Sequence, residues 1–453
     1  MNTKLQNSMF RAGEPTWANA CVGENGSPGI IEYAEGFADA ATVLLDQVLA
    51  NRFRHNTDTF IYPICFNMRH AAELYLKAAI RSIHSLGDRS KGLPLFDMEG
   101  SHDIGRIWGY FREHALSIDR RYRAVVEQLD DAIGDIASVD PTGQVFRYPF
   151  GRENNKHLTD ISIINCRILK TRFEDLRARL AKLGRLNGEL ESEYYLGTFT
   201  SRLSRLDLLC IASMLPPRSD WRTEAFEEAR EKVRTLFNIS SGEFSRALCR
   251  IQDNREMASL LGVPLKFEHC APEQFFAFFD AWFHLNGTAE VNAWLGRKAG
   301  EVREFGLEDT QDMFSNLPLW IKRREDAWNV MEEKLSLEAI GEIDALFNFS
   351  RTSHPYCESF DRERIALTRN LEAERRVGEE SYRNTVFNFM EKFVVLPDVL
   401  NSLNLFGHRD LVDSLLDRYK LAEHAVALIE PSNHRIRDRA KLIQETLDAL
   451  GAW

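Results

Sequence analysis

Two residues in the N-terminal half of the chain, Arg152 and His157, have the types and the spacing to act on a phosphate ester. An arginine guanidinium can hold two oxygens of a phosphate through parallel hydrogen bonds. A histidine titrates near neutral pH, so it can take a proton from a ribose 2′-hydroxyl or give one to a leaving oxygen. These groups suffice for cleaving RNA without a metal ion, and two such sites facing each other across a dimer would complete the chemistry.

The context of this pair carries more weight than its spacing. An arginine and a histidine at a similar separation recur at Arg418 and His424, so the spacing alone is weak support. Residues 146–160, FRYPFGRENNKHLTD, continue a breaker segment and lead into an apolar pattern that predicts a helix over 158–183, with Gly184 as its C-cap. A helix N-terminus offers unpaired N–H groups and a positive dipole end, which favour a bound phosphate. The sequence therefore predicts a site where this loop meets the helix.

A polar stripe on an earlier long helix is the second candidate feature. Apolar residues cover most of the predicted helix 62–84, yet Arg69, Glu73 and Lys77 stand one turn apart along it, with His70 beside them. Glu73 and Lys77 are in the favourable order for an ion pair within a helix. Two interpretations stay open: a solvent-facing stripe with a modest ion pair, or a polar stripe inside a groove between helices.

The pattern of apolar residues predicts an all-α fold in at least two domains. The chain has 453 residues, more than one typical core needs, and Gly and Pro are sparse. We expect an irregular arm over 1–30, about five helices over 31–186 and about ten over 187–453, a region that could itself divide into 187–306 and 307–453. The longer helices predicted in this last region cover 242–261, 361–395 and 398–420.

Composition narrows the classes of function. The formal net charge is −11, which argues against a protein that coats nucleic acid, because such binding depends on neutralising phosphates. The seven cysteines are dispersed without a CxxC pair, so neither a disulfide framework nor a zinc site is expected. The first residues lack the apolar stretch of a signal peptide, and no run of 18 apolar residues occurs. We therefore expect no membrane span and a cytoplasmic location.

The sequence lacks the motifs of several common enzyme classes. It has no GxxxxGK[ST] phosphate loop, no GxGxxG after a predicted strand, no HExxH and no GxSxG. The histidines do not cluster at the spacings of metal ligands, so neither a metal ion nor another cofactor is expected. Acidic pairs on helices are too common in an acidic chain to indicate a carboxylate-pair enzyme. The pair Arg152 and His157 is the candidate that remains.

Four stretches, in this order along the chain, resemble the HEPN superfamily of small helical bundles. RHAAELYLKAAI (69–80) is similar to the second helix of that family, and SHDIGRIWGYF (101–111) to its helix start with His followed by Asp or Asn. FRYPF (146–150) looks like a loop of HEPN-like proteins from prokaryotic defence islands. RENNKH (152–157) fits the family's Arg-x4-6-His motif before the last helix. The resemblance covers residues 31–185 and no more.

In active members the motif implies a metal-independent endoribonuclease, usually dimeric, that works as a toxin or abortive-infection effector. The resemblance implies Arg152 and His157 as the catalytic pair, RNA as the substrate and a homodimer through the HEPN-like domain. One position departs from the pattern, because active members often place Asn, Asp or His directly after the arginine, where this chain has Glu153. The supporting residues that we expect on the same basis are Arg69, Glu73, Lys77 and Asn154.

These features lead to three hypotheses about function. The first is a HEPN-like ribonuclease acting as a toxin or antiviral effector, in which residues 187–453 sense a trigger, restrain the site or bind a partner protein. The second is a non-catalytic HEPN-like scaffold that dimerises or binds RNA, a nucleotide or a partner within a defence complex. The third is an enzyme with its site in 187–453, which no motif supports. The first needs the side chains of Arg152 and His157 to converge.

Overall fold

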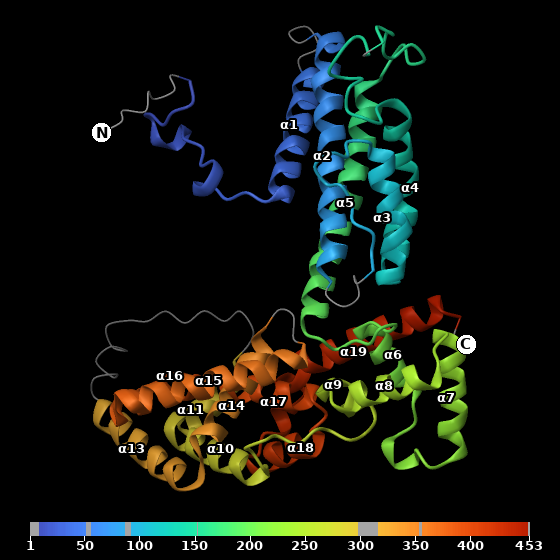
Figure 1. Ribbon diagram of the computed structural model, residues 1–453. Helices are drawn as coiled ribbons and strands as arrows, with labels where there is room; N and C mark the ends of the chain where they lie inside the picture. Colours follow the sequence, from blue (N-terminus) through green and yellow to red (C-terminus); the bar gives the residue numbers. More distant parts are fainter. Residues whose placement is uncertain are drawn as a thin grey trace. The chain divides into compact units, whose positions relative to one another are not determined.

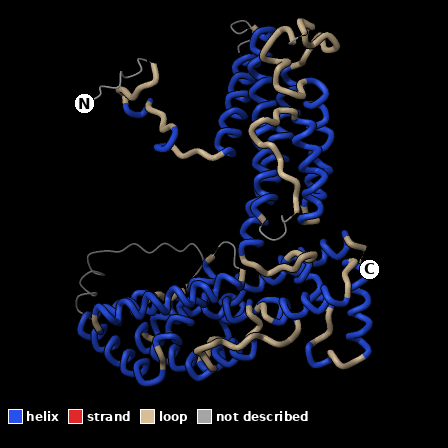
Figure 2. The backbone as a smooth tube through the Cα atoms, in the orientation of Figure 1, coloured by secondary structure: helices blue, strands red, loops and turns tan. Residues whose placement is uncertain are grey.

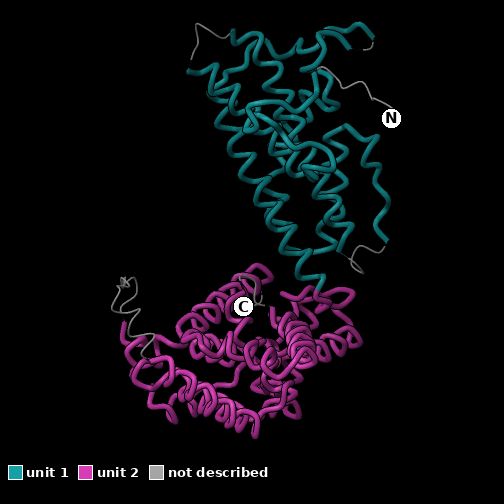
Figure 3. The backbone as a smooth tube through the Cα atoms, turned by 90° about the vertical axis from the view of Figure 1, so that its left-hand side faces the viewer, with its two compact units in different colours: residues 1–195 teal, residues 196–453 magenta. Residues whose placement is uncertain are grey.

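The chain folds into helices and connecting loops that form two compact units. A computed structural model describes residues 9–50, 56–86, 92–151, 153–297, 316–352 and 356–451. Within these ranges there is no β-strand, as predicted (Figure 2). The first unit ends at Tyr195 and the second begins at Leu196 (Figures 1 and 3). The expected boundary at 186 falls inside the last helix of the first unit.

The first unit is a bundle of long helices that follows an N-terminal arm (Figure 1). The arm, residues 9–29, is exposed and contains two single turns of 3-10 helix, Thr16–Ala18 and Gly23–Asn25. The bundle helices are α1 (Ile30–Ala50), α2 (Thr57–Ser85), α3 (Ile104–Ile118), α4 (Tyr122–Val139) and α5 (Cys166–Tyr195).

Helix α2 is the centre of this bundle, because it packs against α1, α3 and α5. The buried residues of α1 recur every three or four positions, which places them on one face of the helix. Three of them, Ala34, Ala38 and Ala41, are small and allow a close approach to α2. On α2, Leu76 and Ile80 are fully buried. Burying each such side chain stabilises the fold by about 1.5–3 kcal/mol.

Helix α5 begins and ends later than the sequence predicts, and both predicted limits were wrong. It begins at Cys166 and not at Leu158, because the Asn165 side chain accepts hydrogen bonds from the N–H groups of Arg167 (2.9 Å) and Ile168 (3.2 Å). It also continues through Gly184 to Tyr195. In this second half, Leu183, Asn187, Leu190 and Tyr194 are buried on one face and pack the extension onto the bundle.

The second unit contains the remaining helices. They are α6 (Arg205–Met214), α7 (Glu224–Phe237), α8 (Ser241–Gln252), α9 (Arg255–Leu260), α10 (Pro272–Asn286), α11 (Thr288–Leu295), α13 (Leu317–Lys334), α14 (Leu337–Arg351), α15 (Cys357–Val377), α16 (Glu379–Met390), α17 (Val395–Leu405), α18 (Arg409–Arg418) and α19 (Ala425–Ala449).

The buried apolar residues of this unit gather in two cores. One core joins residues 203–261 to the end of α19 through Ile443 and Leu447. The other core spans residues 270–428. Helix α19 therefore contributes to both, since Leu428 belongs to the larger core. The division between cores falls near residue 265, whereas the sequence placed an optional division at 306.

Three of the long helices predicted in the second unit are in fact pairs of helices. The helix predicted over 242–261 breaks where the Asn254 side chain accepts the Met257 N–H (3.1 Å) and caps a new helix. The one predicted over 361–395 breaks at Gly378. The one predicted over 398–420 breaks at Gly407, whose φ of 83° is left-handed. A short capping signal thus outweighs a continuous apolar pattern.

Candidate functional site

The loop that carries His157 folds back on itself as a short hairpin, which we call the 149–157 hairpin. Its two arms are joined by a bridge between Phe150 and Lys156. The Gly151 N–H donates to the Asn155 carbonyl (2.9 Å), and the His157 N–H donates to the Pro149 carbonyl (3.1 Å). The hairpin lies at one end of the bundle, between α4 and α5 (Figure 1). The backbone of His157 is therefore held by regular hydrogen bonds.

The imidazole of His157 is oriented by the same loop. Its Nδ1 lies 2.7 Å from the Tyr148 carbonyl oxygen. A carbonyl can only accept, so Nδ1 carries the proton, and in the neutral ring Nε2 is then the acceptor. Nε2 packs against Gly151, where an added Cβ would lie 3.1 Å away. The half-buried ring is thus fixed in a form that can accept a proton.

Arg152 lies outside the described residues, so its convergence with His157 stays a prediction. Its chain neighbours Gly151 and Glu153 belong to the hairpin, and Glu153 is exposed. Asn154, predicted as a supporting residue, is exposed at the turn with a φ of 59°. Asparagine tolerates this left-handed conformation better than most residues, so its structural role is to turn the hairpin.

The predicted helix N-terminus beside His157 is wrong. Residues 158–165 separate His157 from the first turn of α5. The helix dipole acts over about one turn, so the start of α5 contributes little to a phosphate at His157. Only side chains and loop N–H groups remain to hold an anion there.

An arginine and an aromatic ring, neither of which we singled out from the sequence, lie next to the hairpin. The Arg147 guanidinium is 5.5 Å from the centre of the Phe66 ring on α2 and 5.2 Å from that of Tyr148. Phe66 in turn stacks on His70, with ring centres 5.7 Å apart and planes within 7°. Burial lowers the pKa of His70, so this ring is uncharged at neutral pH. The FRYPF pattern could have indicated Arg147, whereas nothing in the sequence indicates Phe66.

The polar stripe of α2 is buried, which excludes the solvent-facing interpretation. Arg69, Glu73 and Lys77 are 3%, 2% and 6% exposed. Glu73 pairs with Arg69 and, at 2.9 Å, with Lys77. Burial alone would raise the pKa of Glu73, but the hydrogen bonds from Lys77, His102 and Arg69 outweigh it and hold the pKa below its ordinary value. The three residues form an internal ion network.

Arg69 connects this network to the loop that leads to the hairpin. Its Nε donates to the Asp140 carbonyl (3.1 Å) and its Nη2 to those of Pro141 (2.7 Å) and His102. Gly143, with a φ of 75°, packs on the guanidinium, and a Cβ there would lie 3.2 Å from Nη1. Arg69 therefore has its donors committed within the protein. It anchors the loop and has little left for a substrate.

His102 is a candidate that sequence reasoning missed. Its Nδ1 lies 2.9 Å from the Glu73 carboxylate, while 61% of the side chain is exposed. A buried carboxylate thus orients an exposed imidazole, an arrangement that suits proton transfer. The signal was present in SHDIG, but we interpreted those residues only as a helix start. Asp103 does cap α3, by accepting the Arg106 N–H at 3.0 Å.

The second unit contains a buried ion cluster that is structural. Arg205 pairs with Glu256 and, at 2.8 Å, with Glu358, and Arg439 reaches Glu256 at 2.9 Å. Burial alone would raise the pKa of Glu256, but the two arginines bring it down to about 2. Burial raises the pKa of the adjacent Cys357 thiol, so this cysteine is protonated at neutral pH and is a poor nucleophile.

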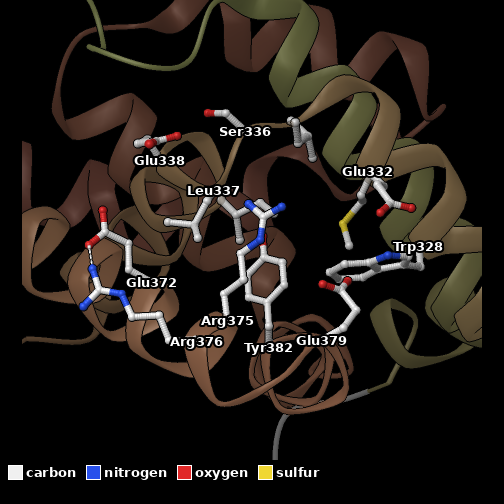
Figure 4. A pocket seen from close by; sticks show the side chains of 13 residues that line it. Trp328, Glu332, Ser336, Leu337, Glu338, Glu372, Arg375, Arg376, Glu379 and Tyr382 are labelled. Atoms are coloured by element: carbon white, nitrogen blue, oxygen red, sulfur yellow. Dashed lines mark ion pairs between the residues drawn. The ribbon is translucent and has the colours of Figure 1, made fainter.

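A cavity of about 500 Å³ lies between α13, α14, α15 and α16 (Figure 4). Carboxylates border it on several sides, at Glu332, Glu338 and Glu379, and Arg375 extends over the Tyr382 ring at 5.8 Å. Burial raises the pKa of Tyr382 to about 12, so its hydroxyl does not ionise near neutral pH. We find no acid–base pair or nucleophile in this cavity that would support catalysis.

The described residues contain neither a cluster of metal-ligand side chains nor a helix suited to cross a membrane. No group of three or more His, Cys, Asp or Glu side chains in this part of the chain could hold a metal ion. None of the described helices is both long and apolar enough to cross a membrane. In comparisons with known proteins, no family model matches the chain, and no curated protein or solved structure is similar enough to count as a match.

Proposed function

We propose that the first unit is a HEPN-like, metal-independent endoribonuclease that acts as a toxin or antiviral effector. The observation that carries the proposal is the hydrogen bond between His157 Nδ1 and the Tyr148 carbonyl, which leaves Nε2 as a proton acceptor. The order of the four HEPN-like stretches supports the same assignment. Residues 196–453 would then sense a trigger, restrain the site or bind a partner protein.

In this proposal His157 begins the reaction and Arg152 holds the phosphate. Nε2 takes the proton of a ribose 2′-hydroxyl, and the resulting O2′ attacks the phosphorus. The bond from phosphorus to O5′ breaks, and O5′ takes a proton from a second imidazolium. In a homodimer this imidazolium would be His157 of the second copy. The products are a 2′,3′-cyclic phosphate and a 5′-hydroxyl.

The surface beside the hairpin offers a place for the RNA chain. The guanidinium of Arg147 lies within 6 Å of the ring centres of both Phe66 and Tyr148. Single-stranded nucleic acids bind to such combinations by stacking bases on rings and pairing phosphates with cations. Because Arg147 lies five residues before Arg152 in the sequence, RNA held here would pass the hairpin.

A second candidate function is a non-catalytic scaffold that binds RNA or a partner without cleaving. Two observations favour it: residues 158–165 separate His157 from α5, and Glu73 is saturated by Arg69, Lys77 and His102. A scaffold and a nuclease would both bind RNA. They differ in whether His157 is needed for a chemical step.

Cleavage of single-stranded RNA in EDTA tests the proposal. Wild-type protein should cleave, and His157→Gln should lower the rate by about 100-fold or more, the usual contribution of a general base. His434→Ala, an exposed histidine on α19, is the matched control and should cleave like the wild type. Absence of cleavage by the wild type, or equal rates for the wild type and His157→Gln, contradicts the proposal.

A third variant identifies the histidine that transfers the proton. His102→Gln should keep most of the activity if His157 is the base. Loss of cleavage in His102→Gln with full activity in His157→Gln would move that role to the Glu73–His102 pair. RNA binding without cleavage, measured by fluorescence anisotropy, would favour the scaffold.

A further inference from the structure

The largest cavity we describe in the second unit, about 910 Å³, lies where the loop 262–271 meets the starts of α10 and α18. We call it the α10–α18 cavity. A hydrogen bond connects the two helices: the hydroxyl of Tyr419, directly after α18, donates to the carbonyl of Phe276 on α10 at 3.0 Å. Its volume is at the upper end of the range of small-molecule sites in proteins, which is about 300–1,000 Å³.

Two cations line this cavity, and no ion pair of either is found among the described residues. Lys266 comes from the loop and Arg409 from the first position of α18. The lining also has two carboxylates: Glu268 pairs with Arg364, and Asp410, next to Arg409, is exposed like both cations. In a chain of net charge −11, a cavity lined by these two cations is suited to an anion.

Aromatic rings form one part of the wall. Phe267 stacks on His408, with ring centres 4.6 Å apart, and meets Phe275 edge-on at 5.4 Å. His408 is held by a hydrogen bond between its Nε2 and the Leu265 carbonyl (3.1 Å). Burial lowers the pKa of His408, so its ring is neutral at neutral pH. A planar ring could pack against this wall at little cost in desolvation.

The cavity wall is closely packed at Gly407. This residue has a φ of 83°, and a Cβ added to it would lie 2.6 Å from the Cβ of Ser259. Both Gly407 and Ser259 line the cavity. The turn that leads into α18 therefore fits closely against the last turn of α9.

We propose that the α10–α18 cavity binds a small molecule with phosphate groups and a planar ring, of the nucleoside polyphosphate class. Lys266 and Arg409 take the phosphates, and Phe267 and Phe276 flank the ring. Two cations from different elements suit a chain of phosphates better than a single carboxylate. The cavity of Figure 4, in the same unit, has a more acidic lining, because four glutamates accompany its two arginines, and it serves as the internal comparison.

Calorimetric titration of the full chain with ATP, tripolyphosphate and adenosine tests this assignment. ATP should bind with a Kd below about 100 μM, tripolyphosphate more weakly, and adenosine most weakly. Failure of ATP to bind at about 1 mM overturns the proposal. Adenosine binding as tightly as ATP overturns the role given to the two cations.

Variants connect the binding to this cavity. Lys266→Ala/Arg409→Ala should weaken ATP binding by about tenfold or more. Lys334→Ala/Arg376→Ala removes the same charge from α13 and α15 and should bind like the wild type. Equal binding by both double variants overturns the assignment, and the single variants replace the first double variant if it fails to fold. Binding is measured without RNA, so this result and that of the cleavage assay are independent.

Discussion

Glu73 and His157 belong to the same unit and were expected to serve one site, yet they differ in burial and in the number of partners that they bind. Glu73 is 2% exposed and receives bonds from Arg69, Lys77 and His102. His157 is half-buried on a hairpin and uses one ring nitrogen for a single carbonyl. The buried carboxylate binds three partners, whereas the hairpin imidazole keeps one ring nitrogen as an acceptor. A buried network such as that of Glu73 stabilises the fold, whereas an imidazole with a free acceptor nitrogen is able to take up a proton.

The largest effect should come from breaking the buried network. Glu73→Ala leaves Arg69 and Lys77 inside the bundle without a counter-charge, which typically costs about 3–5 kcal/mol of unfolding free energy. Urea unfolding of both proteins measures this loss. Asp175→Ala, which removes an exposed pair with Arg179 on α5, is the control and should cost less than about 0.5 kcal/mol. Similar losses in the two variants would show that burial is not the cause.

A smaller loss should follow from Gly143→Ala. This glycine has a φ of 75° and an added Cβ would press on the Arg69 guanidinium at 3.2 Å. A strained backbone of this kind costs about 1–3 kcal/mol. Gly188→Ala on α5 is the matched control, because nothing lies within 4 Å of its Cβ position. There alanine should stabilise the helix by about 0.5–1 kcal/mol. If both substitutions stabilise, Arg69 does not depend on Gly143.

The first unit also shows how much of the structure can be predicted from the sequence. Apolar periodicity located the helices of the first unit, since α2 and α4 follow from residues such as Leu76 and Leu129 on buried faces. It could not show that the stripe of Arg69 is buried. That outcome depends on carbonyls of Asp140 and Pro141, which are remote in sequence.

The predicted limits of helix α5 were wrong for a related reason. One side chain, Asn165, decides where α5 begins, and the apolar residues Ile161 and Ile164 before it have helical spacing without being helical. The order of motifs directed attention to residues 146–157, but it predicted neither the hairpin nor its neighbours. Phe66 meets Arg147 only through the packing of the loop on α2.

The pH dependence of the unfolding free energy provides a further test of the role of Glu73. The pKa of Glu73 lies below its ordinary value of 4.5, so its contribution to stability is present above pH 4.5 and is lost as the pH falls through its folded-state pKa. The difference in unfolding free energy between the wild type and Glu73→Gln should therefore narrow below pH 4.5. The change amounts to about 1.4 kcal/mol for each unit by which the pKa is lowered. Parallel curves for the two proteins would contradict this linkage.

The smallest effect on stability should come from Gly151→Ala in the hairpin. The new Cβ would lie 3.1 Å from His157 Nε2, so the imidazole must shift by a few tenths of an ångström. The half-buried ring can move at little cost, and the unfolding free energy should change by less than about 1 kcal/mol. Misplacing a base by such distances nevertheless slows catalysis, and we expect RNA cleavage to fall by about tenfold. Cleavage that survives Gly151→Ala while it is lost in Glu73→Gln, at a temperature where both are folded, would place the reacting group in the buried network and reverse the roles assigned to the two regions.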